Sequence, residues 1–166
     1  MPEGLEIERV FLLARAPDLP PGAVSLRIEQ GYLPAPRSDR ELEGRLRRIE
    51  RPDGVIDFIH TIKRGSGLVR EEVEHAIDRA TFEREWPRTE RQRLSKTRHE
   101  VREGDHIWQI DLFDQPEGLV LAEVELEGVD DEVAIPPWLA PHIIREVTED
   151  AALTNRAIAR RLGGMA

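Results

Sequence analysis

Charged side chains recur at every second position in several segments of this chain, and this spacing could build a site for ions. The segments are, in chain order, Glu6 and Glu8; Arg45 and Arg47; Arg70, Glu72 and Glu74; Lys96 and Arg98; and Glu123 and Glu125. Side chains two residues apart on a β-strand point to the same face, so each group adds charge to one surface. Separate clusters of carboxylates and of cations indicate a site at which metal ions bridge to a polyanion.

Two architectures account for such charged faces. In a two-layer α+β sheet they form the solvated side, and this interpretation suits any single pair taken alone. In a closed barrel they line the interior, while the apolar side chains between them face outward. The segregation of signs, acidic at Glu6 and Glu8 but basic at Arg45 and Arg47, favours the barrel over a wet surface that mixes signs locally.

Turn signals rich in proline and glycine divide the chain into short segments of alternating hydrophobicity. They predict strands near residues 4–14, 24–33, 42–51, 55–63, 68–75, 91–102, 106–113 and 119–127. The segment 78–86 predicts a short helix that ends at Pro87, and Thr148 is the expected N-cap of a helix from Glu149 to Leu162. This spacing of elements indicates an antiparallel sheet or barrel.

The segment 106–113 shows the two faces most clearly. Gln109 and Asp111 share one face, while Trp108 and Ile110 share the other. We expect the apolar faces of the strands to pack beneath the helices, outside the barrel. The charged faces then turn inward.

Length and composition set limits on compartment and partners. The 166 residues (19.0 kDa) suit one domain over 1–166. A formal net charge of −9 argues against nucleic acid as a partner, because binding to a phosphate backbone needs a basic surface. The sequence has no cysteine, no apolar stretch of roughly 20 residues and no signal-peptide pattern at its start. We therefore expect a cytoplasmic protein without a membrane partner, and its oligomeric state stays open.

Ten short segments, read in order, resemble the CYTH superfamily of triphosphate tunnel metalloenzymes. They are EIERVFLL, QGYL, GRLRRIE, TIKRGSG, REEVE, SKTR, WQIDLF, AEVELE, PPW and EVTED, and the resemblance runs from about Leu5 to Arg161. It implies an α+β fold: an eight-stranded antiparallel β-barrel with flanking helices and a C-terminal helix. The tunnel of such a barrel holds a triphosphate and a divalent metal.

The resemblance also implies roles for the charged residues. The metal ligands would be Glu6, Glu8, Glu123 and Glu125, whose oxygen atoms suit Mg²⁺ or Mn²⁺. The phosphate-binding cations would be Arg45, Arg47, Lys63, Arg70, Lys96 and Arg98. Further catalytic carboxylates, which would hold a second metal or orient the attacking water, fall on Asp111, Glu72 and Glu74. An equal alternative for Glu72 and Glu74 is that they balance the charge of buried arginines.

The chain departs from the family pattern at several positions. Val10 stands where the first motif has a lysine, and Gln109 where a glutamate is usual. Ala152 and Leu153 replace an arginine and a tyrosine near the C-terminus, although Asn155 remains. One or two phosphate contacts and one contact of the C-terminal plug could therefore be missing.

The resemblance implies metal-dependent hydrolysis of a phosphoanhydride bond in inorganic tripolyphosphate or a related small triphosphate. Cyclic AMP synthesis of the class IV adenylate cyclase type is an alternative, but no constellation that would read adenine is visible. A second alternative is a module that binds a triphosphate or polyphosphate without turnover. The valine at position 10 is the main support for this last hypothesis.

Overall fold

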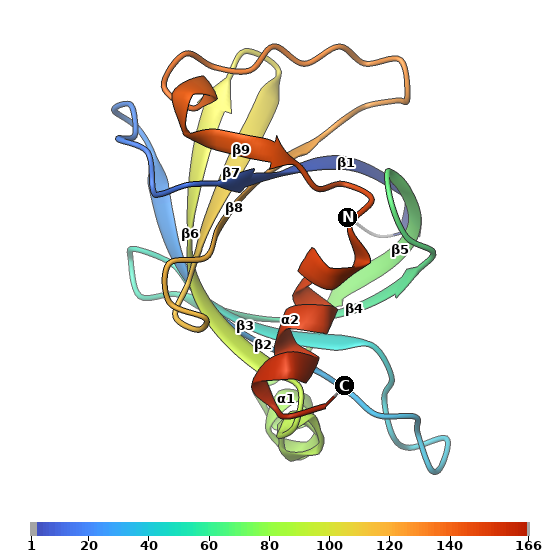
Figure 1. Cartoon of the computed structure of the whole chain (residues 1–166). Coiled ribbons are helices and arrows are strands. Elements are labelled where there is room, and N and C mark those ends of the chain that lie inside the picture. Colours follow the sequence, from blue (N-terminus) through green and yellow to red (C-terminus); the bar gives the residue numbers. More distant parts are fainter. Residues whose placement is uncertain (1–2, 166) are drawn as a thin grey trace.

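The computed structural model describes residues 3–165, and its strands form a closed antiparallel barrel (Figure 1). The eight barrel strands are β1 (Glu3–Leu13), β2 (Val24–Tyr32), β3 (Arg45–Glu50), β4 (Ile56–Arg64), β5 (Val69–Ala76), β6 (Arg93–Glu103), β7 (His106–Phe113) and β8 (Val120–Glu125). They follow one another in the order β5-β4-β3-β2-β6-β7-β8-β1, and β1 pairs with β5 to close the ring. The expected eight-stranded barrel is therefore confirmed. Residues 1, 2 and 166 of the expected domain lie outside the described range.

The first strand pairs with three others. One edge of β1 pairs with β8 from Glu8 to Leu13. The other edge carries β5 along Glu3–Ile7 and then β9 (Ile143–Glu146) along Phe11–Leu13. The sequence does not predict β9, because its four residues show no distinctive alternation.

The register of the strands places the charged faces inside the barrel. Residues that lie opposite each other in an antiparallel pair share a face. These opposed pairs include Glu6 with Arg70, Lys63 with Glu72, Arg98 with Asp111, and Glu8 with Glu125. The expected inward-facing charges thus come from one consistent register around the ring.

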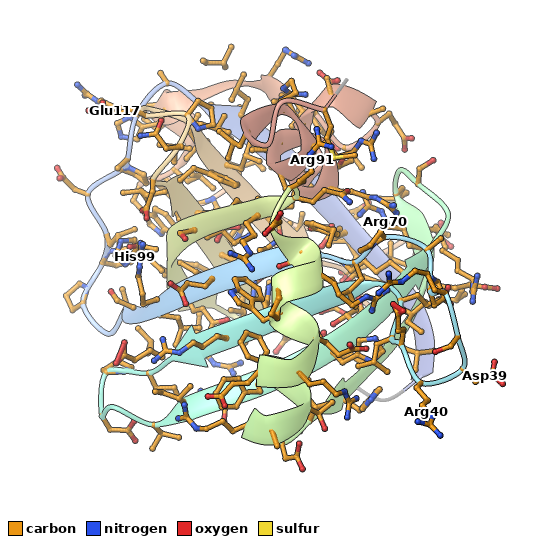
Figure 2. All side chains as sticks on the ribbon, turned by 90° about the horizontal axis from the view of Figure 1, so that it is seen from below. Asp39, Arg40, Arg70, Arg91, His99 and Glu117 are labelled. Carbon is orange, nitrogen blue, oxygen red and sulfur yellow. The ribbon has the colours of Figure 1, made fainter. Side chains whose placement is uncertain are left out.

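The helix α1 (Arg79–Glu85) covers the outer apolar face of β3 and β4 (Figure 2). Its Phe82 ring lies 4.7 Å from that of Phe58, and both rings pack with Leu46. The side chain of Asp78 caps the helix by accepting a hydrogen bond from the Thr81 amide. This arrangement matches the expected helix at 78–86, which a 3₁₀ turn at Trp86–Thr89 follows.

The outer face of β7 and β8 is covered differently from our expectation. Trp108 and Ile110 are fully buried there, as the alternation predicts. Their cover is the irregular segment between β8 and β9, which inserts the fully buried Leu139, rather than a helix. The alternation in a strand predicts that its apolar face is buried, but it does not predict which element covers that face.

The helix α2 (Asn155–Leu162) lies across part of the barrel opening and packs against β6 and β2 (Figure 1). Ile158 and Ala159 of α2 pack against inward-facing apolar residues. The barrel residues of this cluster are Val10, Tyr32, Leu94, Phe113 and Leu121. The interior is therefore apolar beneath α2 and charged beyond it. No helix within residues 3–165 is long and apolar enough to cross a membrane.

The start of α2 differs from the expectation. The helix begins at Asn155 with Thr154 as its N-cap, whereas Thr148 was the expected cap. The Thr148 hydroxyl accepts a hydrogen bond from the Val10 amide and donates one to Glu146. It ties the chain to β1, so this threonine is not available as a cap. Asp150 then caps a 3₁₀ turn at Ala151–Leu153.

Replacing Thr154 by alanine should lower the free energy of unfolding by about 1 kcal/mol, because the Ala157 amide loses the hydroxyl that accepts its hydrogen bond. Urea unfolding followed by circular dichroism measures this change. Thr154→Ser keeps the hydroxyl and should stay near the wild-type midpoint. Equal midpoints for Thr154→Ala and Thr154→Ser would show that this cap does not stabilise α2.

Candidate functional site

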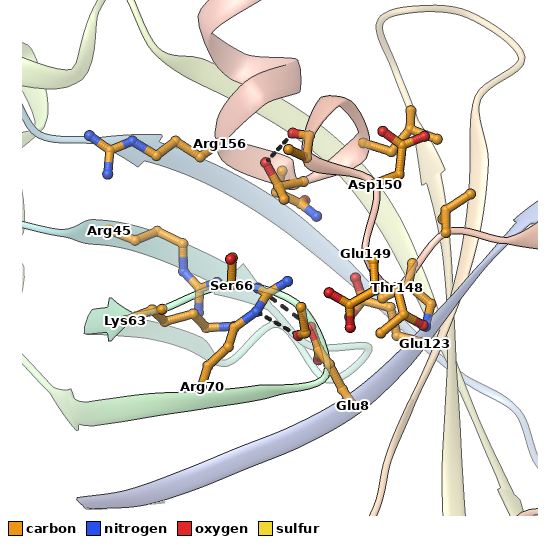
Figure 3. A pocket seen from close by; sticks show the side chains of 18 of the residues that line it. Glu8, Arg45, Lys63, Ser66, Arg70, Glu123, Thr148, Glu149, Asp150 and Arg156 are labelled. Atoms are coloured by element: carbon orange, nitrogen blue, oxygen red, sulfur yellow. Dashed lines mark hydrogen bonds and ion pairs between the residues drawn. The ribbon is translucent and has the colours of Figure 1, made fainter.

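A cavity of about 350 Å³ lies between the charged part of the barrel interior and the segment that leads into α2 (Figure 3). Six expected site residues from five strands line it: Glu8, Arg45, Arg47, Lys63, Arg70 and Glu123. The turn 65–67 and the residues 147–151 and 153–156 also line it. Figure 3 shows cations on one side of this cavity and Glu8 and Glu123 on the other. The other expected site residues do not line the cavity. They are Glu6, Glu72, Glu74, Lys96, Arg98, Asp111 and Glu125.

Lys96, Arg98 and Asp111 form a buried ion cluster behind the cavity. The Nζ atom of Lys96 lies 2.8 Å from Asp111 Oδ2, and the Nε and Nη2 atoms of Arg98 donate to the two oxygens of Asp111 at 2.7 and 2.9 Å. Although burial alone would raise it, the pKa of Asp111 is held well below its usual range by Arg98 and Lys96. Both of its oxygens are therefore already engaged by cations.

Glu6 and Glu72 meet at Lys63. The Nζ atom of Lys63 lies 2.8 Å from Glu6 Oε1 and 3.6 Å from Glu72 Oε2. Burial, and then the neighbouring Glu6, raise the pKa of Glu72 to about 8. Burial would raise the pKa of Glu6 as well, but a hydrogen bond from Glu72 and the charge of Lys63 lower it to about 2. The two carboxyl groups thus share one proton at neutral pH.

The two arginines of β3 have different partners. Arg45 lies 3.7 Å from Glu74, and the Thr61 hydroxyl, which accepts from Arg45, donates to Glu74 at 3.0 Å. Arg47 instead donates from Nε to the side-chain oxygen of Gln30 at 2.9 Å. Burial, and then the charges of Arg45 and Arg98, lower the pKa of Arg47 to about 9. The side-chain hydrogen bond of Arg47 is therefore to an uncharged group.

The carboxylates of Glu8 and Glu123 lie on the acidic side of the cavity, which Glu149 also lines. Burial, and then the neighbouring Glu123, raise the pKa of Glu8 to about 7, although Arg70 lies 3.8 Å away. Glu125 lies beside Glu8 in the register but is exposed and does not line the cavity. Crowded carboxylates of this kind are stabilised by a cation.

The donor set consists of carboxylate oxygens, which fit a hard divalent metal. Within residues 3–165, no three acidic or histidine side chains form a preassembled metal site. Mg²⁺, however, is commonly held by only one or two carboxylates together with substrate phosphates. Glu8 and Glu123 supply such a pair next to the cations of the cavity.

Two neutral residues that contact the tunnel cations carried no predicted role, although Asn155 was recognised as a position shared with the family pattern. Gln30 and Asn155 are neutral, yet their side chains contact the tunnel cations Arg47 and Lys96. Gln30 lies within the QGYL segment at an inward-facing position, which was the available signal. Uncharged amides such as these are not part of the pattern of alternating charges.

The departures from the family pattern fall at different places. Val10 lines the cavity beside Glu8 and lies opposite Glu123 in the register. Leu153 lines it as well, whereas Ala152 is exposed. Gln109 donates a hydrogen bond to Glu100 at 2.9 Å, away from the cavity. The lysine expected at position 10 is therefore the missing cation that bears directly on this site.

A relative of known name shares almost the whole length of the chain. No family model matches the sequence. The inorganic triphosphatase of Nitrosomonas europaea is 39% identical over 158 residues, which cover 93% of this chain and 96% of that protein. The chain belongs to the inorganic triphosphatase family.

Solved structures agree with this membership. The crystal structure of the inorganic triphosphatase NE1496 matches this family member with a TM-score of 0.58 and 32% identity, over 93% of this chain and 94% of the other. The PH1819 protein of Pyrococcus horikoshii OT3 matches with a TM-score of 0.54 and 15% identity, over 75% of this chain and 80% of the other. This second match shows a shared fold alone.

Val10→Lys should strengthen tripolyphosphate binding or raise its turnover, because an ammonium group would reach the cavity beside Glu8 and Glu123. Burial of the new lysine costs desolvation energy, which the two glutamates partly offset, so the thermal midpoint should fall slightly. Steady-state kinetics and thermal unfolding measure the two effects. Val10→Met adds bulk without charge and should give no gain. Equal kinetics for Val10→Lys and Val10→Met would contradict a role for a cation at this position.

Proposed function

We propose that the protein hydrolyses a terminal phosphoanhydride bond of inorganic tripolyphosphate, or of a related small triphosphate, with Mg²⁺ or Mn²⁺. The observation that carries this proposal is the cavity with cations on one side and Glu8 and Glu123 on the other. It occurs in a chain that is 39% identical to a protein named inorganic triphosphatase.

The tunnel cations are proposed to bind the phosphate groups. They are Arg45, Arg47, Lys63 and Arg70 in the cavity lining, with Lys96 and Arg98 behind them. Phosphoryl transfer spreads negative charge over the phosphoryl oxygens, so positioning and electrostatic stabilisation supply most of the catalysis. Donors held in place before the substrate arrives are suited to this task, because they need no reorganisation during the reaction.

The carboxylates are proposed to divide into two groups. The metal would be held by Glu8 and Glu123. Glu125 lies opposite Glu8 in the register, and Glu6 precedes Glu8 by two residues on β1. When bound, the metal neutralises phosphate charge and orients the phosphate groups. Asp111, Glu72 and Glu74 are each paired with a cation, which supports charge balance and positioning for these three. A second metal at Asp111 would have to displace Lys96 or Arg98.

Binding without turnover is the second candidate. The observation that favours it is Val10, which places an apolar side chain in the cavity lining. A binding module would be stabilised by tripolyphosphate but would release no phosphate. Incubation with tripolyphosphate or ATP and with Mg²⁺ or Mn²⁺ separates the hypotheses through three readouts: free phosphate, cyclic AMP and the thermal midpoint.

The hydrolase proposal predicts phosphate release from tripolyphosphate that depends on Lys96. Lys96→Ala should weaken binding or turnover by about tenfold or more, because a hydrogen bond to a charged group contributes roughly 1.5–3 kcal/mol. Phosphate release is measured by colorimetry. Arg40→Ala removes a cation from the exposed loop seen in Figure 2 and should keep wild-type kinetics. Wild-type kinetics in Lys96→Ala would exclude this lysine from the site.

The metal proposal predicts a pH-dependent stabilisation by Mg²⁺. Because the pKa of Glu8 is raised to about 7, its neutral form stabilises the free protein fully below about pH 4.5. That contribution is lost as the pH rises to about 7, where the carboxylate becomes available to a metal. The Mg²⁺-induced increase in thermal midpoint should therefore be larger at pH 8 than at pH 6.

Glu8→Gln should remove this pH dependence and abolish turnover while the barrel stays folded. Glu117→Gln, on an exposed turn between β7 and β8, is the matched control and should behave like the wild type. An unchanged pH-dependent response to Mg²⁺ in Glu8→Gln would place the metal elsewhere.

A further inference from the structure

Gln30 has a fully buried side chain in the wall of the charged interior. It lies opposite Arg47 of β3 and opposite the apolar Leu94 of β6. Burial of an amide costs free energy unless its polar atoms are hydrogen-bonded, whereas an apolar side chain would pack next to Leu94 without that cost. The contacts of the amide must therefore account for its presence.

All of the polar atoms of this amide are used. Its Oε1 atom accepts a hydrogen bond from Arg47 Nε at 2.9 Å. Its Nε2 atom donates to the Tyr32 hydroxyl at 3.0 Å and to Asn155 Oδ1 at 3.3 Å. An arginine only donates, so the amide oxygen must face Arg47 and the amide nitrogen must face Asn155.

Asn155 extends the chain of contacts to a second cation. Its Oδ1 atom also accepts a hydrogen bond from Lys96 Nζ at 2.7 Å. A lysine ammonium only donates, so this contact fixes the orientation of the Asn155 amide as well. Two neutral amides, one in the barrel wall and one at the start of α2, thus connect Arg47 to Lys96.

The neutrality of these partners has an electrostatic consequence. Lys63, Arg70 and Arg98 each lie within 4 Å of a glutamate or aspartate. Among the described residues, Arg47 has no such ion pair, and its side-chain partner is the uncharged oxygen of Gln30. An amide can fix the direction of a guanidinium without cancelling its charge. The positive charge of Arg47 therefore stays available to an anion.

We propose that Gln30 is a positioning residue for the phosphate site. It holds Arg47 directly and Lys96 through Asn155, and it leaves the charge of Arg47 uncompensated for the phosphate groups of the substrate. The inference rests on the proposed function of the tunnel. Gln30 does not touch the substrate in this proposal, but it determines the positions of two cations that bind the phosphate groups. Through Asn155 it also connects α2 to the anion site.

The test compares Gln30→Met and Gln30→Glu with the wild type. Gln30→Met keeps the length of the side chain but loses all three hydrogen bonds, and tripolyphosphate binding should weaken at least tenfold. Gln30→Glu is nearly isosteric, places a carboxylate on Arg47 and removes the donor to Asn155, so it should weaken binding further. Calorimetric titration with tripolyphosphate gives Kd, and steady-state hydrolysis gives KM and kcat.

A control variant and a double variant distinguish a positioning role of Gln30 from a merely structural one. Gln92 is a buried glutamine outside the cavity lining, and Gln92→Met serves as the matched control with wild-type binding. If Gln30 acts through Arg47, the free-energy effects of Gln30→Met and Arg47→Met should be less than additive in the double variant. Full additivity, or wild-type Kd in Gln30→Met, would overturn the proposal. Gln30→Glu keeps it testable if Gln30→Met does not fold.

The same measurements separate this inference from the proposed function. If the wild type binds tripolyphosphate but releases no phosphate, hydrolysis is refuted and Kd still tests Gln30. If the wild type hydrolyses tripolyphosphate and the Gln30 variants bind it equally well, the positioning role is refuted alone. A wild type that neither binds nor hydrolyses tripolyphosphate overturns both.

Discussion

Burial of many charges inside one closed barrel is the constraint on which the rest of the structure depends. A charged group taken out of water costs several kcal/mol unless an opposite charge and hydrogen bonds compensate it. Here the compensation comes from neighbouring strands, as in the pairs Lys63 with Glu6 and Arg98 with Asp111. A shift of one residue in any strand would turn its charges outward and leave their partners buried alone. The ion pairs therefore also specify the register of the barrel.

The site consists of the charges that this pairing leaves incompletely compensated. Arg47 has a neutral partner, and Glu8 is crowded by Glu123. These two uncompensated charges have opposite signs, and both side chains line the same cavity. An anion and a cation bound together would satisfy both, whereas either alone would satisfy one. A triphosphate with a divalent metal combines an anion and a cation in this way. The free energy of binding can therefore come from charges that are incompletely compensated in the free protein.

The alternation of charges predicted that residues such as Glu6, Arg98 and Asp111 lie on the charged faces of strands, because a period of two residues is a local property of the chain. It favoured a barrel over a solvated sheet, whereas the number of eight strands was predicted from the resemblance to the CYTH superfamily. The N-cap of α2 was predicted wrongly at Thr148. Both Thr148 and Thr154 can cap a helix, and the choice depends on a contact with β1, which is distant in the sequence. The contacts of Gln30 were not visible for the same reason, since its partners Arg47 and Asn155 come from other elements.

The pairing of β1 has a consequence for how the molecule assembles during synthesis. β1 is made before each of its partners, β5, β8 and β9, and β9 ends only at Glu146. Contacts of such large sequence separation form slowly, because the entropy of closing long loops must be overcome first. The growing chain therefore carries an unpaired edge of β1 until these partners have been made, and during this time edge-to-edge aggregation is a hazard. Glu6 and Glu8 on this strand place charges on one of its faces that oppose such association.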